Sequence, residues 1–274
     1  MSLTGDLKAR LAEIGIEPKK ALGQNFLISR QVIQKIIAAV RSHEGEFKDL
    51  IEVGPGVGAL TEPLLEAGLD VRLRLIELDR DLIAYWRARG LAVIDADALK
   101  LDWETLNLSA PALLVSNLPY QISTHLVVER CLGPERLRWM ILMFQKEVAQ
   151  RLTARPRTKD YGLLSVMAQL HWRMYKIADA APGDFFPPPK VASRVLAFER
   201  ISAEGLGTPF LKFLKAAFAL RRKFLLKNVK GVVDKAKHDR IPRLLEELGH
   251  SDKARAEELS PGDFARLFGQ LRDR

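Results

Sequence analysis

Short apolar runs alternate with longer amphipathic stretches through most of the chain. The apolar runs predict strands at residues 50–53, 71–77, 91–94, 112–116 and 137–144. The stretches between them predict helices at residues 61–67, 81–89, 123–131 and 145–154. Gly68 and Gly90 stand where helix C-caps belong. This alternation is typical of βαβ units, so we expect a mostly parallel sheet.

Two further strands complete the predicted sheet. Residues 161–171 predict a helix, after which residues 172–178 and 194–200 predict strands connected by a proline-rich loop. Because this connection is too short for a helical crossover, we expect the two strands to be antiparallel. The sequence therefore predicts seven strands, with an antiparallel edge on a mostly parallel sheet.

Both ends of the chain predict helices outside this sheet. A basic stretch at residues 3–14 predicts one helix, and Ser29 is a candidate N-cap for a second. After a linker at residues 201–207 only helical patterns occur, and Ser260 is a good start for a last helix that ends near Leu271. We therefore expect two domains, residues 1–204 and residues 205–274.

Composition narrows the classes of protein and of partner. The 274 residues carry a formal net charge of +9, and residues 201–274 hold 16 basic against 10 acidic side chains. A polyanionic partner and an ordinary basic surface explain this charge equally well. The single cysteine, Cys131, excludes an internal disulfide framework and a multi-cysteine metal site. No apolar run reaches the roughly 18 residues of a membrane helix, so we expect no membrane partner and a cytoplasmic location.

A glycine-rich turn follows the first strand of the predicted sheet. Gly54, Gly56 and Gly58 have the spacing Gly-x-Gly-x-Gly, which differs from the dinucleotide-binding pattern Gly-x-Gly-x-x-Gly. Glycines at such a turn let the backbone approach a ligand closely. Taken alone, the motif indicates a tight strand-to-helix turn as readily as a ligand site.

Three polar residues recur at regular spacing after this turn. Glu77 follows Gly54 by 23 residues, Asp97 comes 20 residues later, and Asn117 another 20. Each stands at the end of a predicted strand, so all should face the crevice where open α/β sheets bind ligands. Glu77 could accept from both hydroxyls of a ribose, and Asp97 from an adenine amine. The joint spacing predicts a nucleotide-containing cofactor.

Asn117 also begins the motif Asn-Leu-Pro-Tyr. Its side-chain oxygen and the backbone carbonyl of Leu118 could accept both protons of an amine, with Pro119 fixing the chain direction. Tyr120 offers a flat face for a base. Without the glycine turn, an ordinary strand-end turn is the simpler interpretation of these residues.

Together these motifs resemble a known family. The glycine turn and the three polar residues resemble S-adenosylmethionine-dependent methyltransferases, and Asn-Leu-Pro-Tyr resembles their adenine-N6 branch. Four more stretches resemble the ribosomal-RNA adenine dimethyltransferases of the KsgA type: residues 22–27, 144–149, 161–165 and 185–191. The resemblance covers about residues 20–230. It implies an α/β fold, a Rossmann-like class I methyltransferase with a small all-helical C-terminal domain.

The resemblance implies a role for each matching residue. It assigns S-adenosyl-L-methionine to Asn25, Leu27, Gly54, Gly56, Glu77, Asp97 and Asn117. It assigns the catalytic site to Asn117, Leu118, Pro119, Tyr120 and Phe185, with the two aromatic rings stacking on the target base. Phe186 stands where the family has a smaller or polar residue, so it is open which of the two phenylalanines stacks.

Contacts with RNA are expected from basic residues. The assigned side chains are Lys190, Arg221, Arg222, Lys223 and Lys227. The run at residues 221–230 has five basic residues and no acid, which at helical spacing predicts a phosphate-tracking face or a solvated amphipathic helix. Its Arg-Arg-Lys start resembles the family and favours RNA.

The implied reaction is dimethylation of N6 in two adjacent adenosines near the 3′ end of small-subunit (16S) ribosomal RNA. The N6 lone pair is delocalised into the ring, so oxygens that accept its protons would free it and stabilise the charge that develops. No metal is expected, since none of the five histidines has a ligand-like partner at metal spacing. The implied partner is ribosomal RNA within an immature 30S subunit, met by a monomer.

Three other functions are compatible with parts of this sequence. An Erm-like methyltransferase of large-subunit RNA shares the catalytic motifs. A DNA adenine methyltransferase would normally need a larger target-recognition domain than residues 205–274 provide. A ribosome assembly factor could bind immature subunits and use methylation only as a release step.

Overall fold

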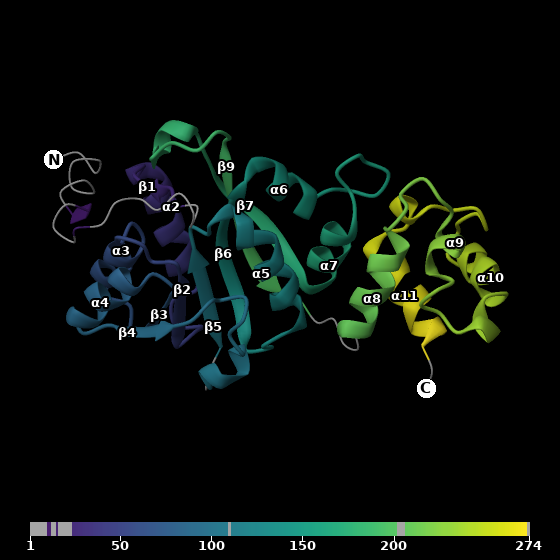
Figure 1. Cartoon of the computed structure of the whole chain (residues 1–274), viewed down its shortest axis with the longest axis horizontal. Coiled ribbons are helices and arrows are strands. Elements are labelled where there is room, and N and C mark those ends of the chain that lie inside the picture. Colours follow the sequence, from purple (N-terminus) through teal and green to yellow (C-terminus); the bar gives the residue numbers. More distant parts are fainter. Residues whose placement is uncertain (1–9, 12–14, 16–23, 109–110, 202–205, 273–274) are drawn as a thin grey trace. The chain divides into compact units, whose positions relative to one another are not determined.

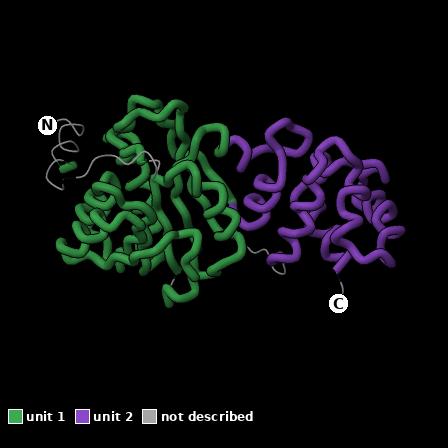
Figure 2. The backbone as a smooth tube through the Cα atoms, viewed as in Figure 1, with its two compact units in different colours: residues 1–149, 173–200 green, residues 150–172, 201–274 purple. Residues whose placement is uncertain are grey.

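The chain folds into two compact units. The computed structural model describes residues 10–11, 15, 24–108, 111–201 and 206–272 (Figure 1). One unit consists of residues 1–149 and 173–200, and the other of residues 150–172 and 201–274 (Figure 2). The helical unit thus differs from the predicted domain of residues 205–274, because it also takes in residues 150–172. Most of the predicted helix at residues 3–14 lies outside the described residues.

A seven-strand sheet forms the centre of the first unit. Its strands stand in the order β4 (Ala92–Asp95), β3 (Arg72–Glu77), β2 (Asp49–Val53), β5 (Ala112–Ser116), β6 (Leu137–Gln145), β9 (Ser193–Arg200) and β7 (Trp172–Ala180). The first five are parallel, and β9 is antiparallel to β6. Arg173 pairs with Glu199 and Asp179 with Arg194, so β7 and β9 run antiparallel as well. The predicted sheet is confirmed.

Helices alternate with these strands close to the predicted positions. They are α2 (Arg30–Arg41), α3 (Thr61–Glu66), α4 (Arg80–Ala88), α5 (Tyr120–Leu132) and α6 (Lys146–Leu152), with a 3-10 turn at Trp103–Leu106. Ser29 occupies the N-cap position of α2, as predicted. Gly68 and Gly90 take φ angles of 66° and 78° just beyond helix ends, which confirms their predicted role. α5 begins three residues before its predicted start, because Pro119 stands at its N-cap.

Both faces of the sheet are buried. Leu50 and Leu113 pack on one face with Ile36 of α2. At alternate positions of the same strands, Ile51 and Leu114 are also fully buried, and α5 packs against β6. Strands covered on both sides explain why the sequence shows continuous apolar runs there rather than alternation. The carboxyl ends of the parallel strands are left as the place where loops can form a site.

A two-strand sheet, which the hydrophobic pattern did not predict, lies apart from the main one. β1 (Phe26–Leu27) pairs antiparallel with β8 (Phe185–Phe186), so Phe26 lies opposite Phe186 and Leu27 opposite Phe185. Strands of two residues have no period to detect, and more than half of the chain separates them. The pairing holds the segment that carries Asn25.

The second unit is a helical cluster with an aromatic core. Its helices are α7 (Leu163–His171), α8 (Thr208–Ala217), α9 (Leu225–Val229), α10 (Arg240–Glu247) and α11 (Pro261–Leu271), with 3-10 turns at Lys235–Lys237 and Ala256–Glu258. The ring centroids of Phe210 and Phe213 lie 5.2 Å and 5.5 Å from that of Phe268. Ser260 and Asp263 form a capping box at the start of α11, which ends at the predicted residue.

Candidate active site

Loops at the carboxyl ends of β2, β3, β4 and β5 surround one pocket in the first unit. The predicted residues that line it are Asn25, Gly54, Gly56, Glu77, Asp97, Asn117, Leu118, Pro119 and Tyr120. Parallel strands end at the same edge of a sheet, so regular spacing along the chain becomes proximity in space. Two other predicted residues, Leu27 and Phe185, are absent from this lining.

The glycine loop presents bare backbone to the pocket. Gly54 and Gly56 have φ angles of 65° and 55°, which side-chain-bearing residues rarely adopt. A Cβ atom on Gly56 would lie 2.9 Å from the ring of Phe26, so this position has no room for a side chain. A ligand can therefore come close to the main chain here, as the sequence pattern predicted.

Glu77 and Asp97 present carboxylates that the backbone orients. Oε1 of Glu77 accepts from the N–H groups of Leu78 at 2.7 Å and Asp79 at 3.0 Å. Burial raises the pKa of Glu77, although these backbone donors oppose the shift. Oδ1 of Asp97 accepts from the N–H of Leu99 at 2.9 Å. Glu77 also accepts from the N–H of Gly56, and Oδ2 of Asp97 lies 4.0 Å from Nζ of Lys100. A ligand hydroxyl or amine would therefore use the remaining lone pairs of these carboxylate oxygens.

The side chain of Asn117 has one defined orientation. Its Nδ2 donates to the backbone carbonyl of Asn25 over 3.0 Å. A carbonyl can only accept, so the amide nitrogen must face Asn25, and Oδ1 is the end left to accept from a ligand. This bond also links the end of β5 to the segment that leads into β1. The pocket thus has an amide acceptor set by the fold.

Beside Phe26, Tyr120 is the aromatic residue of the pocket lining. Its hydroxyl lies 2.7 Å from Oγ of Ser193, which is fully buried, and burial raises the pKa of the phenol. Phe185 is only 2% exposed and packs in the core with Leu27, because its pairing in the two-strand sheet turns its ring inward. Phe186 is half-buried and also lies outside the lining. Neither phenylalanine lines the pocket, and Leu27 does not line it either. The stacking role stays a prediction.

Sequence reasoning missed Glu52 and Leu78. Leu78 follows Glu77 and is an exposed apolar residue at the pocket rim. Glu52 also lines the pocket, is 2% exposed, and accepts from Oγ1 of Thr61 at 2.8 Å. Burial raises its pKa from 4.5 to about 8, while the Thr61 hydrogen bond opposes the shift. The signal that could have revealed Glu52 is an acid inside the apolar run that forms β2.

Glu52→Gln should flatten the pH dependence of stability. The folded pKa lies above the unfolded one, so between about pH 4.5 and pH 8 the native state keeps a proton that the unfolded state has released. Wild-type stability therefore falls over this range by up to about 1.4 kcal/mol per pH unit from this group. Urea unfolding at several pH values should show that the free energy of unfolding of the variant rises relative to that of wild type as pH rises. Parallel curves for the two proteins would contradict the buried, protonated Glu52.

The basic run at residues 221–230 does not form one helix. Only Leu225–Val229 is helical, and residues 221–223 lie in the turns before it. The predicted RNA-contacting side chains are nevertheless exposed: Lys190 in the first unit, and Arg221, Arg222, Lys223 and Lys227 in the second. Lys227 lies over the ring of Phe224, with Nζ 5.8 Å from the ring centroid. The predicted phosphate-tracking helix face is thus replaced by a turn and a short helix.

Arg221 is engaged by its own unit. Its Nε donates to Glu257 at 2.6 Å, and its terminal nitrogens donate to the carbonyls of Thr158 and Lys159. The N–H of Arg157 donates to the carbonyl of Glu257 at 2.8 Å. Arg221 therefore holds the basic loop around residues 155–159 in place, which uses the planar fork of a guanidinium.

Two negative findings apply to the part of the chain that the structure describes. No group of three or more histidine, cysteine, aspartate or glutamate side chains there could hold a metal ion. Within the same residues, no helix has the length and apolar character needed to cross a bilayer.

The sheet order, the glycine loop and the acidic residues at the strand ends define a Rossmann-like methyltransferase of the α/β class. Two solved structures have this fold. A dimethyladenosine transferase from Plasmodium falciparum matches 89% of this chain and 96% of its own, with a TM-score of 0.75 and 24% identity. The 23S rRNA methyltransferase ErmE matches 90% of this chain and 99% of its own, with a TM-score of 0.64 and 25% identity.

Sequence comparison gives the particular family. The family model for ribosomal RNA adenine dimethylase matches residues 16–273. A ribosomal RNA small subunit methyltransferase A from Bdellovibrio bacteriovorus is 52% identical over 258 residues, 93% of each chain. Its counterpart from Syntrophotalea carbinolica is 40% identical over 257 residues, 91% of this chain and 95% of its own. The chain belongs to the ribosomal RNA adenine dimethylase family, which confirms the resemblance, and it is an enzyme of the methyltransferase class.

Proposed function

We propose that this protein transfers methyl groups from S-adenosyl-L-methionine to N6 of adenosine in small-subunit ribosomal RNA, twice on each target. The observation that carries the proposal is the orientation of Asn117. Its Nδ2 is bonded to the carbonyl of Asn25, which leaves Oδ1 to accept a proton of the target amine. Family membership and a relative at 52% identity that is named for the small subunit support the choice of substrate.

The pocket fits S-adenosyl-L-methionine by the chemistry of its donors and acceptors. Gly54 and Gly56 leave a cradle that a Cβ atom would strain or fill. Glu77 would accept from the ribose hydroxyls, and Asp97 from the adenine amine, through the lone pairs that their contacts with the protein leave. Asn25 lies beside Asn117, where the methionine end would be held. When bound, the cofactor supplies an electrophilic methyl group on a sulfonium sulfur.

The residues of the Asn-Leu-Pro-Tyr motif would activate the target amine. Oδ1 of Asn117 and the Leu118 carbonyl accept its two protons, which favours a tetrahedral nitrogen with a free lone pair. As that nitrogen gains positive charge, the same two oxygens stabilise it, like an oxyanion hole with the signs reversed. Pro119 fixes the direction of the chain, and Tyr120 offers its ring to the base. Positioning supplies the rest. The methylated nitrogen would be cationic and acidic, so it can release one proton to water and no side chain has to act as a strong base.

The finer substrate assignment rests on the resemblance of the sequence to its family. This resemblance implies that the targets are two adjacent adenosines near the 3′ end of the RNA, within an immature 30S subunit. It also implies that the protein acts as a monomer in the cytoplasm. A panel of acceptors tests this assignment: undermethylated small subunits, large subunits, naked RNA and duplex DNA, each given methyl-labelled cofactor. Incorporation into small subunits supports the proposal. Incorporation into large subunits alone would move the protein to the Erm-like branch.

Arg221 and Arg222 should differ when each is replaced by alanine. Arg222 is exposed in the turn, so losing it should remove one phosphate contact and reduce the slope of log affinity against log salt by about 0.7 to 1. Arg221 holds the loop at residues 155–159, so losing it should lower the thermal unfolding midpoint. RNA-binding titrations at several salt concentrations and melting curves check both effects. An unchanged salt slope for Arg222→Ala, or an unchanged midpoint for Arg221→Ala, would contradict these separate roles.

A further inference from the structure

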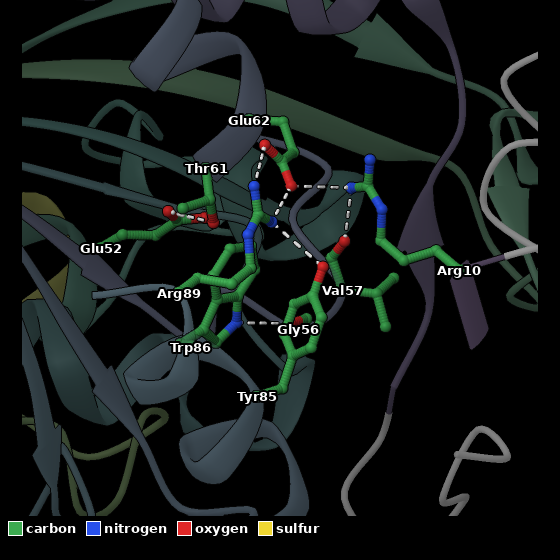
Figure 3. Close-up of polar contacts among 9 residues, drawn as sticks. All are labelled: Arg10, Glu52, Gly56, Val57, Thr61, Glu62, Tyr85, Trp86 and Arg89. Carbon is green, nitrogen blue, oxygen red and sulfur yellow. Dashed lines mark hydrogen bonds and ion pairs between the residues drawn. The ribbon is translucent and has the colours of Figure 1, made fainter. Parts of the chain in front are cut away.

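The glycine loop has an outer side that faces away from the pocket lining. Gly54 and Gly56 line the pocket, whereas Val57 and Gly58 line a neighbouring recess together with Arg10 and Glu62. Two side chains bond the carbonyl oxygens of this loop. Nε1 of Trp86 donates to Gly56 at 2.9 Å, and Nη1 of Arg10 donates to Val57 at 2.8 Å (Figure 3). The loop is thus held by its carbonyl groups.

Glu62 connects Arg10 to the residues around Trp86. It lies between Arg10 and Arg89, as Figure 3 shows, with Oε1 3.4 Å from Nη1 of Arg10 and Oε2 3.1 Å from Nη2 of Arg89. Arg89 also donates to the hydroxyl of Tyr85 at 3.0 Å and lies over the ring of Trp86, 5.1 Å from its centroid. The Glu62 side chain is only 19% exposed, so its ion pairs with Arg10 and Arg89 form in a partly desolvated place.

The loop fits tightly against these side chains. A Cβ atom on Gly58 would lie 2.8 Å from the Trp86 ring, 3.1 Å from Nη1 of Arg10 and 3.1 Å from Cγ of Glu62. Leu11, next to Arg10 in the chain, is 6% exposed and packs in one apolar cluster with Val57 and Trp86. A small shift of Arg10 or Glu62 would therefore be passed to the backbone that lines the pocket.

We infer that Arg10 and Glu62 are positioning residues for the cofactor pocket: Arg10, held by Glu62, fixes the carbonyl of Val57 and so sets the glycine loop for binding. Neither residue lines the pocket, so both act through the loop. Binding of the cofactor then depends on a residue far from the loop in sequence. The inference deepens the proposed function and rests on it, because the ligand in question is S-adenosyl-L-methionine.

Steady-state kinetics and calorimetric binding of S-adenosyl-L-methionine test this role in the full chain. Arg10→Ala should raise KM and Kd for the cofactor by about tenfold, the loss of one charge-assisted hydrogen bond. kcat at saturating cofactor should change by less than about twofold, because the reacting groups are untouched. Arg10→Lys should recover much of the affinity, since an ammonium can still donate to Val57 and pair with Glu62.

Glu62→Ala and the double variant keep the test decisive if Arg10→Ala proves unstable. Both residues act through the same carbonyl, so the double variant should lose little more affinity than Arg10→Ala alone. Arg173→Ala, which breaks an exposed arginine–carboxylate pair between β7 and β9, is the matched control and should leave KM unchanged. Unchanged cofactor affinity in folded Arg10→Ala and Glu62→Ala would overturn the inference, as would an Arg10→Lys variant no better than alanine. If the unsubstituted chain binds no cofactor, the proposed function fails first.

Discussion

Asn117→Ala should lower kcat for methyl transfer by about a hundred- to a thousandfold, the usual effect of removing one preorganised group that stabilises developing charge. The Asn117 side chain bonds Asn25 through Nδ2, and its Oδ1 is the acceptor proposed for the target amine. Alanine removes that acceptor and leaves the amine lone pair delocalised. The affinity for the cofactor should fall less than kcat, because Glu77, Asp97 and the glycine loop are unchanged. Single-turnover rates with saturating cofactor and small subunits measure the effect.

Two further variants make this result specific. Gln121 lies in the first turn of α5, lines the same pocket and is exposed, so Gln121→Ala should keep most of the activity. Asn117→Asp keeps an oxygen acceptor but replaces the donor to Asn25 with a second oxygen, so its carboxylate and that carbonyl repel each other. The kcat of Asn117→Asp should therefore be well below that of wild type. Full turnover in Asn117→Ala would remove this residue from the mechanism.

Asp49→Ala should destabilise the protein by about 3 kcal/mol, the low end of the cost of breaking a buried ion pair. Asp49 is fully buried at the start of β2, the end of the strand opposite the pocket. It pairs with Arg72 at 2.8 Å and with Arg74 at 3.2 Å. Removing the carboxylate leaves Arg74, whose side chain is only 20% exposed, next to an empty space. The half-exposed Arg72 can turn to water, which limits the loss.

Urea unfolding and a melting curve measure the stability lost in Asp49→Ala. A change of this size lowers the thermal midpoint of a chain this long by roughly 5 °C. Asp70 is the matched control: it pairs with Lys48 at 2.8 Å, but its side chain is 99% exposed, so Asp70→Ala should leave the midpoint nearly unchanged. Equal midpoints for Asp49→Ala and wild type would show that the buried pair contributes nothing. Cofactor affinity should survive in the folded fraction.

The sequence predicts well what depends on local pattern. Strand β5 has its predicted bounds, and α11 ends at the predicted Leu271, because Ser260 and Asp263 form the cap that fixes its start. The position of the pocket could also be predicted from local pattern. Glu77 ends one strand of the parallel sheet, and Asp97 and Asn117 follow two others, so their regular spacing places them at one edge.

Features that depend on contacts distant in the chain were not predictable. The pairing of Phe26–Leu27 with Phe185–Phe186 has no periodic signal, and it puts Phe185 in the core, where a stacking role had been expected. Nothing in the sequence distinguishes Arg221 from the other basic residues of its run. Its structural role follows from hydrogen bonds to the carbonyls of Thr158 and Lys159, which are distant in the chain. The same long-range packing adds residues 150–172 to the helical unit.

The chemical identity of the product tests most directly whether this protein dimethylates N6 of adenosine in small-subunit ribosomal RNA. The purified protein would be incubated with S-adenosyl-L-methionine and undermethylated small subunits, and the ribosomal RNA then digested to nucleosides and analysed by mass spectrometry. We expect N6,N6-dimethyladenosine from the wild-type chain and almost none from Asn117→Ala at matched times. Cofactor binding without any methylated adenosine, or methylation at an atom other than N6, would contradict it.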